Sequence, residues 1–153
     1  MRLKEFLNTE FVVVRLSSTD VEGVVSEVAT RAAEAGVGNA EAVRDKLLER
    51  ERQHPTVVGA GLAIPHATVP GLTTPSIGVA LADPGVAFGR EDHDPVHAFF
   101  VLLSPPGHER EHVKLLARIC RLARHADFLD QLLAADDGAG VVSVLLSIDD
   151  QHV

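Results

Sequence analysis

Residues 56–66 form an apolar run that two glycines interrupt and that ends in a proline followed by a histidine. Glycine tolerates positive φ angles, so the chain can turn tightly at Gly59 and Gly61. The apolar residues between the second glycine and Pro65 are typical of a short buried strand, and the proline favours an extended conformation for the residue before it. His66 is therefore expected at the mouth of a sheet, on rigid backbone and open to a partner. The same pattern also fits a structural or solvated histidine that ends a strand.

Apolar runs typical of strands alternate with amphipathic patterns typical of helices along the rest of the chain. The predicted strands are residues 11–16, 76–82, 86–88 and 95–104, with a turn at 83–85 and a charged loop at 89–94. The predicted helices are a segment capped by Thr19 and ended by Gly36, a segment from an Asn39 cap to about Arg52, and residues 108–124, 128–133 and 141–146. This alternation predicts an α/β sandwich with a mixed β-sheet, in which 95–104 is the central strand.

The composition limits the class of protein. A length of 153 residues suits one domain over residues 1–153. The net charge of −8 argues against nucleic acid or an anionic membrane as the main partner, because both bind clustered lysine and arginine. No apolar run approaches the roughly 18 residues that span a bilayer, and the amino terminus lacks the apolar core of a signal peptide. Cys120 is the only cysteine, which fits a reducing compartment, so a cytoplasmic protein is expected.

Three short motifs follow one another along the chain. Arg50 and Glu51 lie near the end of the second predicted helix, residues 63–66 are Ala-Ile-Pro-His, and His112 opens a helix that contains leucines. In this order they resemble the IIA domain of the fructose, mannitol and nitrogen-regulatory branch of the bacterial phosphoenolpyruvate-dependent phosphotransferase system. The resemblance covers residues 17–146, nearly the whole chain. It implies a central mixed sheet with helices packed on both faces.

The resemblance also implies roles for three residues. His66 is expected to be phosphorylated through its Nε2 atom, Arg50 to steady the phosphoryl oxygens, and His112 to lie beside His66 and support it. Histidine suits this transfer because a neutral imidazole is a nucleophile at cytoplasmic pH, and arginine because its planar fork makes two parallel hydrogen bonds. Without the resemblance, Arg50 and His112 are also explained as residues that satisfy helix termini.

Two neighbours of these residues are expected to assist them. Glu51 is expected to hold the Arg50 guanidinium in place, and Thr56 to orient one imidazole ring. Neither a metal ion nor another cofactor is expected, because phosphoryl transfer between histidines needs only a neutral nitrogen, in-line approach and positive charge on the oxygens.

The implied partners are proteins. The resemblance predicts that an HPr-type phosphocarrier delivers the phosphoryl group and that a IIB domain of a sugar permease receives it. The alternative is a stand-alone regulatory protein of the nitrogen branch, which binds target proteins according to its phosphorylation state. Phosphorylation adds up to about two negative charges to an acidic protein, enough to repel or recruit such a target. Both roles use His66, so the sequence leaves them open.

His108, Glu109 and His112 also fit the zinc-metalloprotease pattern His-Glu-x-x-His. Histidines four residues apart on one helix can bind zinc, with the glutamate as general base, so a zinc metallohydrolase is the remote alternative. The Pro-Pro-Gly sequence at 105–107 places His108 at or outside the first helical turn, which argues against a shared face. The remaining histidines are expected to be surface groups: His54, His93, His97, His125 and His152.

Overall fold

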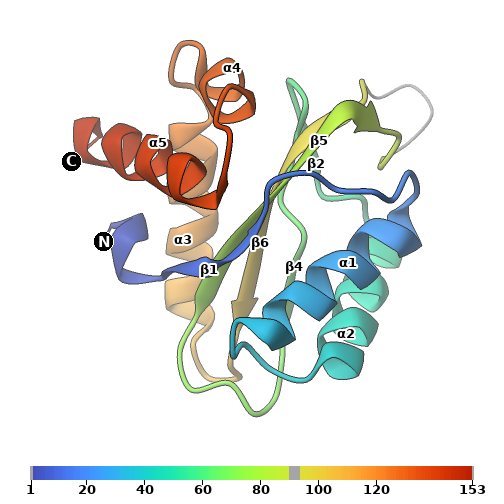
Figure 1. Cartoon of the computed structure of the whole chain (residues 1–153). Helices are drawn as coiled ribbons and strands as arrows, with labels where there is room; N and C mark the ends of the chain where they lie inside the picture. Colours follow the sequence, from blue (N-terminus) through green and yellow to red (C-terminus); the bar gives the residue numbers. More distant parts are fainter. Residues whose placement is uncertain (1, 90–93, 153) are drawn as a thin grey trace.

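The structure is a computed structural model that describes residues 2–89 and 94–152. Within these two ranges, five α-helices and six β-strands follow a short 3-10 helix at Leu3–Glu5 (Figure 1). The strands are β1 (Leu7–Val13), β2 (Val57–Gly59), β3 (Leu62–Ala63), β4 (His66–Thr68), β5 (Ser76–Val86) and β6 (Val96–Ser104). The helices are α1 (Val21–Glu34), α2 (Ala40–Gln53), α3 (Glu109–Leu122), α4 (Phe128–Leu133) and α5 (Gly138–Gln151).

The strands form one mixed sheet in the order β1-β5-β6-β3-β2, and β4 also pairs with β6. β5 and β6 are antiparallel, whereas β1 runs parallel to β5 and both β3 and β4 run parallel to β6. β6 therefore has neighbours on both sides, which confirms the prediction that it is the central strand. It is also buried along nearly its whole length.

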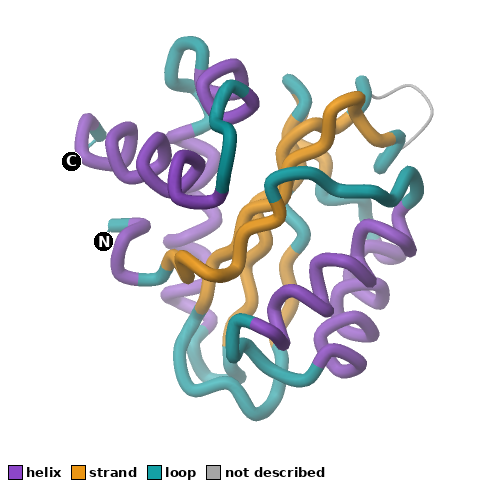
Figure 2. Tube along the Cα trace, viewed as in Figure 1, coloured by secondary structure: helices purple, strands orange, loops and turns teal. Residues whose placement is uncertain are grey.

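The helices cover both faces of the sheet, as predicted. α1 and α2 lie on one side of the strands and α3, α4 and α5 on the other (Figures 1 and 2). Each face has its own apolar core, because successive side chains of a strand point to opposite faces. Along β6 one set enters the core beneath α1 and α2, and the alternate set enters the core beneath α3 to α5. The first set is Phe99, Val101 and Leu103, and the second is Ala98, Phe100 and Leu102.

Side-chain caps begin α1, α2 and α5. The Asn39 side chain accepts a hydrogen bond of 3.1 Å from the backbone N–H of Ala42, which confirms the predicted cap of α2. The predicted cap of α1 is wrong by one residue, because Asp20 rather than Thr19 accepts from the N–H of Gly23, at 2.8 Å. An aspartate carboxylate caps a helix at least as well as a threonine hydroxyl.

Several element boundaries differ from the prediction. β1 covers residues 7–13 rather than 11–16: Leu7 is buried and pairs with Ile77 of β5, and the exposed Thr9 and Glu10 fall where the register with β5 shifts. β5 continues through 83–85, where a turn was predicted, and Val86 still pairs with Val96. The separate strand predicted at 86–88 is therefore wrong, because Val86 is the last residue of β5. The register of β5 with β6 shifts between Leu81 and Val86, and an irregular stretch of this kind tolerates proline and glycine. α5 is longer than predicted, and residues 90–93 of the predicted charged loop lie outside the described residues.

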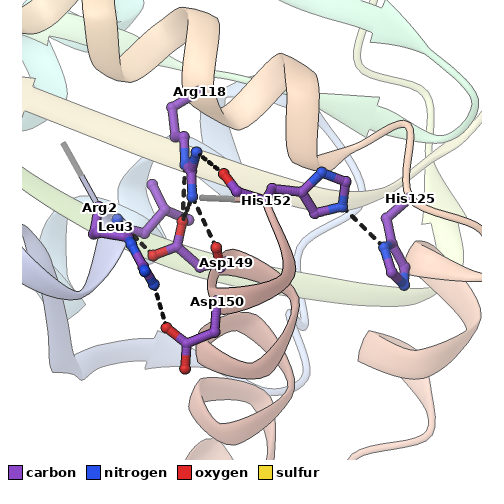
Figure 3. A network of polar contacts seen from close by, with 7 residues as sticks. All are labelled: Arg2, Leu3, Arg118, His125, Asp149, Asp150 and His152. Atoms are coloured by element: carbon purple, nitrogen blue, oxygen red, sulfur yellow. Dashed lines mark hydrogen bonds and ion pairs between the residues drawn. The ribbon is translucent and has the colours of Figure 1, made fainter.

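A buried ion pair that the sequence analysis did not predict ties α3 to both ends of the chain (Figure 3). Arg118 and Asp149 are 6% and 0% exposed. The guanidinium donates to Asp149 Oδ1 from Nε at 2.9 Å and from Nη2 at 2.6 Å, and the other carboxylate oxygen accepts from the Leu3 N–H at 2.9 Å. Arg118 also donates to the backbone carbonyl of His152. The N-terminal turn, α3 and the end of α5 therefore share one polar contact in an apolar surrounding.

Among residues 2–89 and 94–152, the structure has no helix of sufficient length and apolar character to cross a membrane.

Candidate functional site

His66 is the first residue of β4, which lies along the carboxyl-terminal part of β6. His66 is in register with Leu102, and the Leu102 N–H donates to the carbonyl of Pro65 at 3.0 Å. β3 and β4 pair one after the other with β6. Ile64 and Pro65 separate the two strands, and the proline has no N–H to donate. In the described part of the sheet β4 pairs with β6 alone. The His66 ring is thus partly buried at a sheet edge that α2 and α3 flank.

The His66 ring is held by the backbone two residues before it. Its Nδ1 lies 2.7 Å from the carbonyl oxygen of Ile64. A carbonyl oxygen only accepts hydrogen bonds, so Nδ1 must carry the proton and donate. The lone pair of the neutral ring is therefore on Nε2, the nitrogen at which the resemblance expects phosphorylation.

The three candidate residues lie around one cavity of about 270 Å³, although they come from distant parts of the chain. Arg50 is in the last turn of α2, His66 opens β4, and His112 is in the first turn of α3. The centroids of the two imidazole rings are 5.4 Å apart, and the ring planes are tilted by 60°. The other residues that line the cavity are Lys46, Glu49, Gln53, Ala67 and Thr68.

α2 supplies the positive charge of the site. Lys46 and Arg50 are four residues apart, so they lie on the same face of the helix, and both line the cavity. Arg50 Nη1 donates to the carbonyl of His54 at 2.8 Å, which fixes the guanidinium near the end of the helix. Glu49 lies 3.9 Å from the Lys46 ammonium and offsets part of its charge. Lys46 was absent from the prediction, although its spacing from Arg50 is a signal for it.

The Glu51 carboxylate does not hold the Arg50 guanidinium, contrary to the prediction. Its two oxygens accept from the N–H and the hydroxyl of Thr56, both at 2.7 Å. The Thr56 hydroxyl is thereby engaged and does not orient an imidazole ring. The Thr56 carbonyl instead accepts from the Ile64 N–H at 3.0 Å, and Ile64 holds His66. A chain of hydrogen bonds therefore connects the end of α2 to the His66 ring.

His112 is held by a residue that the sequence analysis missed. Ser104, the last residue of β6, is 1% exposed, and its Oγ lies 2.7 Å from His112 Nδ1. A serine that ends an apolar strand gives no signal by itself, because turns often begin with serine.

Both imidazoles are kept neutral by their surroundings. Burial lowers the pKa of His66, the hydrogen bond to Ile64 opposes this, and the nearby Arg50 charge lowers the pKa further. Burial also lowers the pKa of His112 to about 4, with a smaller contribution from His66 and an opposing one from Glu109. At neutral pH the site therefore contains two uncharged rings beside two cationic side chains.

These lowered pKa values make the stability of the fold depend on pH. A histidine in the unfolded chain takes up its proton near pH 6.5, whereas His112 in the fold has a pKa of about 4. The unfolded state binds more protons between these values, so the free energy of unfolding falls as the pH drops from 6.5 toward 4. We expect the free energy of unfolding of His112→Gln, measured by urea titration at several pH values in this range, to fall less steeply as the pH drops. If the free energy of unfolding changed equally steeply with pH in the variant and the unaltered chain, the lowered pKa of His112 would be contradicted.

The zinc-binding interpretation gains no support from the geometry. α3 begins at Glu109, so His108 is the residue before the first turn, as predicted. His108 Nδ1 pairs with Glu111 Oε1 at 2.5 Å, whereas His112 bonds to Ser104. Within the two described ranges, no three histidine, cysteine or carboxylate side chains come together as a metal site would need.

The other histidines only partly match the expectation of surface groups. His54 is exposed, and His93 lies outside the described residues. The rings of three others are partly buried and have structural partners. His97 Nδ1 lies 2.9 Å from the Ala82 carbonyl, and His125 Nδ1 lies 3.0 Å from His152 Nε2.

Comparison with known proteins supports the assignment that the motifs implied. The family model described as phosphoenolpyruvate-dependent sugar phosphotransferase system, EIIA 2, matches residues 5–148. A nitrogen regulatory protein of Bradyrhizobium diazoefficiens is 36% identical over 145 residues, 95% of each chain. The fructose-specific EIIA component of the phosphotransferase system of Haloferax volcanii is 32% identical over 128 residues, 83% of each chain.

Solved structures share the fold. The nitrogen regulatory protein IIA-Ntr from Neisseria meningitidis superposes with a TM-score of 0.83 at 22% identity, over 92% of this chain and 97% of that one. The IIA mannitol protein of Escherichia coli, in its complex with phosphorylated IIB mannitol, gives 0.75 at 18% identity over 90% and 95%. The family model spans nearly the whole sequence and two relatives align over most of their length, so the chain belongs to the EIIA 2 family of the phosphoenolpyruvate-dependent sugar phosphotransferase system.

Proposed function

We propose that this chain is a cytoplasmic phosphocarrier that accepts a phosphoryl group on His66 Nε2 from an HPr-type phosphohistidine protein. The observation that carries the proposal is the hydrogen bond between His66 Nδ1 and the Ile64 carbonyl. That bond leaves the nucleophilic lone pair on Nε2, in a ring that lines the same cavity as Arg50.

The transfer step needs no further reactant. The Nε2 lone pair attacks phosphorus and forms a P–N bond, while the P–N bond to the donor histidine breaks and its electron pair returns to the donor nitrogen. The Nδ1 proton stays on His66, where the Ile64 carbonyl stabilises the positive charge that develops on the ring. The reverse step on an acceptor residue follows the same path.

α2 supplies the electrostatic stabilisation in this proposal. The phosphoryl oxygens gain negative charge near Arg50 and Lys46, which stand ready before the donor arrives. Burial and, to a smaller extent, the Arg50 charge lower the pKa of His66, which keeps its lone pair free. The positive charge on α2 thus favours both the neutral His66 nucleophile and the phosphoryl group that it receives.

The destination of the phosphoryl group has two candidates. A IIB domain of a sugar permease is one, since a relative is a fructose-specific EIIA component and a structural neighbour is complexed with phosphorylated IIB mannitol. A regulatory target is the other, favoured by the 36% identity to a nitrogen regulatory protein over 95% of both chains. A pull-down with phosphorylated and unphosphorylated chain separates them, because a IIB domain accepts the label whereas a regulatory target changes only its binding.

The geometry predicts that Arg50→Lys slows phosphoryl uptake about tenfold, because lysine keeps the charge and loses the planar fork. Arg52→Lys is the matched control on the same turn. Its side chain is 70% exposed, lies 3.8 Å from Glu22 and does not line the cavity. Initial rates of label transfer from phosphorylated HPr measure both variants. Equal rates for Arg50→Lys and the unaltered chain would remove Arg50 from the proposed role.

The proposal is tested by incubating the chain with phosphoenolpyruvate, enzyme I and HPr-type proteins of the sugar and nitrogen branches. We expect one acid-labile, base-stable phosphoryl group per chain, as befits a P–N bond. Absence of any uptake from either donor would overturn the proposal.

A further inference from the structure

Ser104 has a narrow set of partners. The residue is 1% exposed, and within residues 2–89 and 94–152 the hydrogen-bond partner of its hydroxyl is His112 Nδ1, at 2.7 Å. Its backbone carbonyl is already occupied by the N–H of Val69 at 2.8 Å. A buried O–H group almost always donates to some acceptor, and here Nδ1 is the acceptor within reach.

The direction of this hydrogen bond decides where the His112 proton lies. A ring nitrogen that accepts carries no proton, so a neutral His112 that accepts at Nδ1 must carry its proton on Nε2. His66 has the opposite arrangement, with the proton on Nδ1 and the lone pair on Nε2. We propose that Ser104 is a positioning residue that fixes His112 as the Nε2–H tautomer, so that His112 donates a hydrogen bond to the phosphoryl group carried by His66.

The arrangement of the two rings supports this role. Both rings line one cavity, and their centroids are 5.4 Å apart. In each ring Nδ1 is bonded to a neighbour, so Nε2 is the nitrogen left for a phosphoryl group in the cavity. A lone pair at His112 Nε2 would repel the phosphoryl oxygens, whereas an N–H there attracts them. The other charged or titratable groups around the cavity are Lys46, Glu49 and Arg50 on α2 and Glu109 on α3. The inference rests on the proposed function of His66.

The first test measures tautomers without any phosphoryl transfer. Nitrogen-15 NMR of the unphosphorylated chain at neutral pH is expected to place the proton on Nδ1 of His66 and on Nε2 of His112. A proton on Nδ1 of His112 would overturn the inference while leaving the proposed function intact.

Ser104→Ala gives a second test, through the sign of a pKa change. Serine that donates to Nδ1 stabilises the neutral ring alone, so its removal should raise the pKa of His112 in an NMR titration. A serine that accepted from Nδ1–H would stabilise the protonated ring as well, so its removal would lower that pKa. A fall after Ser104→Ala would therefore overturn the inference.

The third test is a double-mutant cycle on the rate of phosphoryl uptake. Ser104→Ala is expected to slow uptake about tenfold, the effect of losing roughly one hydrogen bond to the phosphoryl group. In a His112→Ala chain the same substitution should have no further effect, because Ser104 acts through His112. An equal slowing in both backgrounds would contradict this route. If neither the unaltered chain nor any variant takes up label while the tautomers are as stated, the proposed function fails and the tautomer assignment stands.

Discussion

His66→Gln is expected to take up no phosphoryl group from an HPr-type donor, whereas the unaltered chain takes up one. Glutamine has similar size and polarity but no nucleophilic nitrogen, so the P–N bond cannot form. Mass spectrometry of the intact chain, kept at alkaline pH to preserve the P–N bond, measures the loss. Label on the His66→Gln chain would place the phosphorylated residue elsewhere.

Two other histidines provide controls for this result. His54→Gln changes an exposed histidine directly after α2 and should leave uptake unchanged. His112→Gln removes the neighbouring ring, so uptake should be slower yet still reach one group per chain. Complete loss in His112→Gln, with uptake intact in His66→Gln, would exchange the roles of the two rings.

The second large effect concerns stability. Asp149→Ala is expected to lower the free energy of unfolding by about 3–5 kcal/mol, because it leaves the Arg118 guanidinium buried without its counter-charge. It also removes the acceptor for the Leu3 N–H, so the N-terminal turn loses this hydrogen bond to α5. The matched control is Asp150→Ala, which removes a carboxylate that is 64% exposed and pairs with Arg2. Exposed pairs of this kind contribute about 0–1 kcal/mol.

Urea unfolding followed by far-ultraviolet circular dichroism measures both variants. Tryptophan fluorescence is unsuitable because the chain has no tryptophan or tyrosine. If Asp149→Ala lowered the free energy of unfolding as little as Asp150→Ala does, the buried pair would add little to the stability of the fold.

The sequence predicted the parts of the fold that strong patterns mark. The apolar run at 95–104 became the central strand, and the helix at 128–133 was predicted with its observed bounds. The short strands β2 and β4 were missed, because segments of three residues are too short to show a period of two. The turn predicted at 83–85 was wrong, because pairing with β6 overrides the local preference of proline and glycine.

The motifs predicted the three main residues of the candidate site, but not all of the residues that hold them in place. Arg50, His66 and His112 were proposed from motifs, and the structure places them around one cavity. Ser104 and the Glu51 contact with Thr56 depend on which side chains the fold brings within 3 Å, and no periodic pattern carries that information. The pair of Arg118 and Asp149 was missed for the same reason, since a charged residue in an amphipathic helix is usually at the surface.

We propose that the Ile64 carbonyl holds the proton on His66 Nδ1 and so directs phosphorylation to Nε2. Phosphorus-31 and nitrogen-15 NMR of the phosphorylated chain identifies the nitrogen that bears the group. We expect a phosphorus coupling to Nε2 of His66, with Nδ1 still protonated and bonded to Ile64. A phosphoryl group on Nδ1 of His66, or on any other residue, would contradict it.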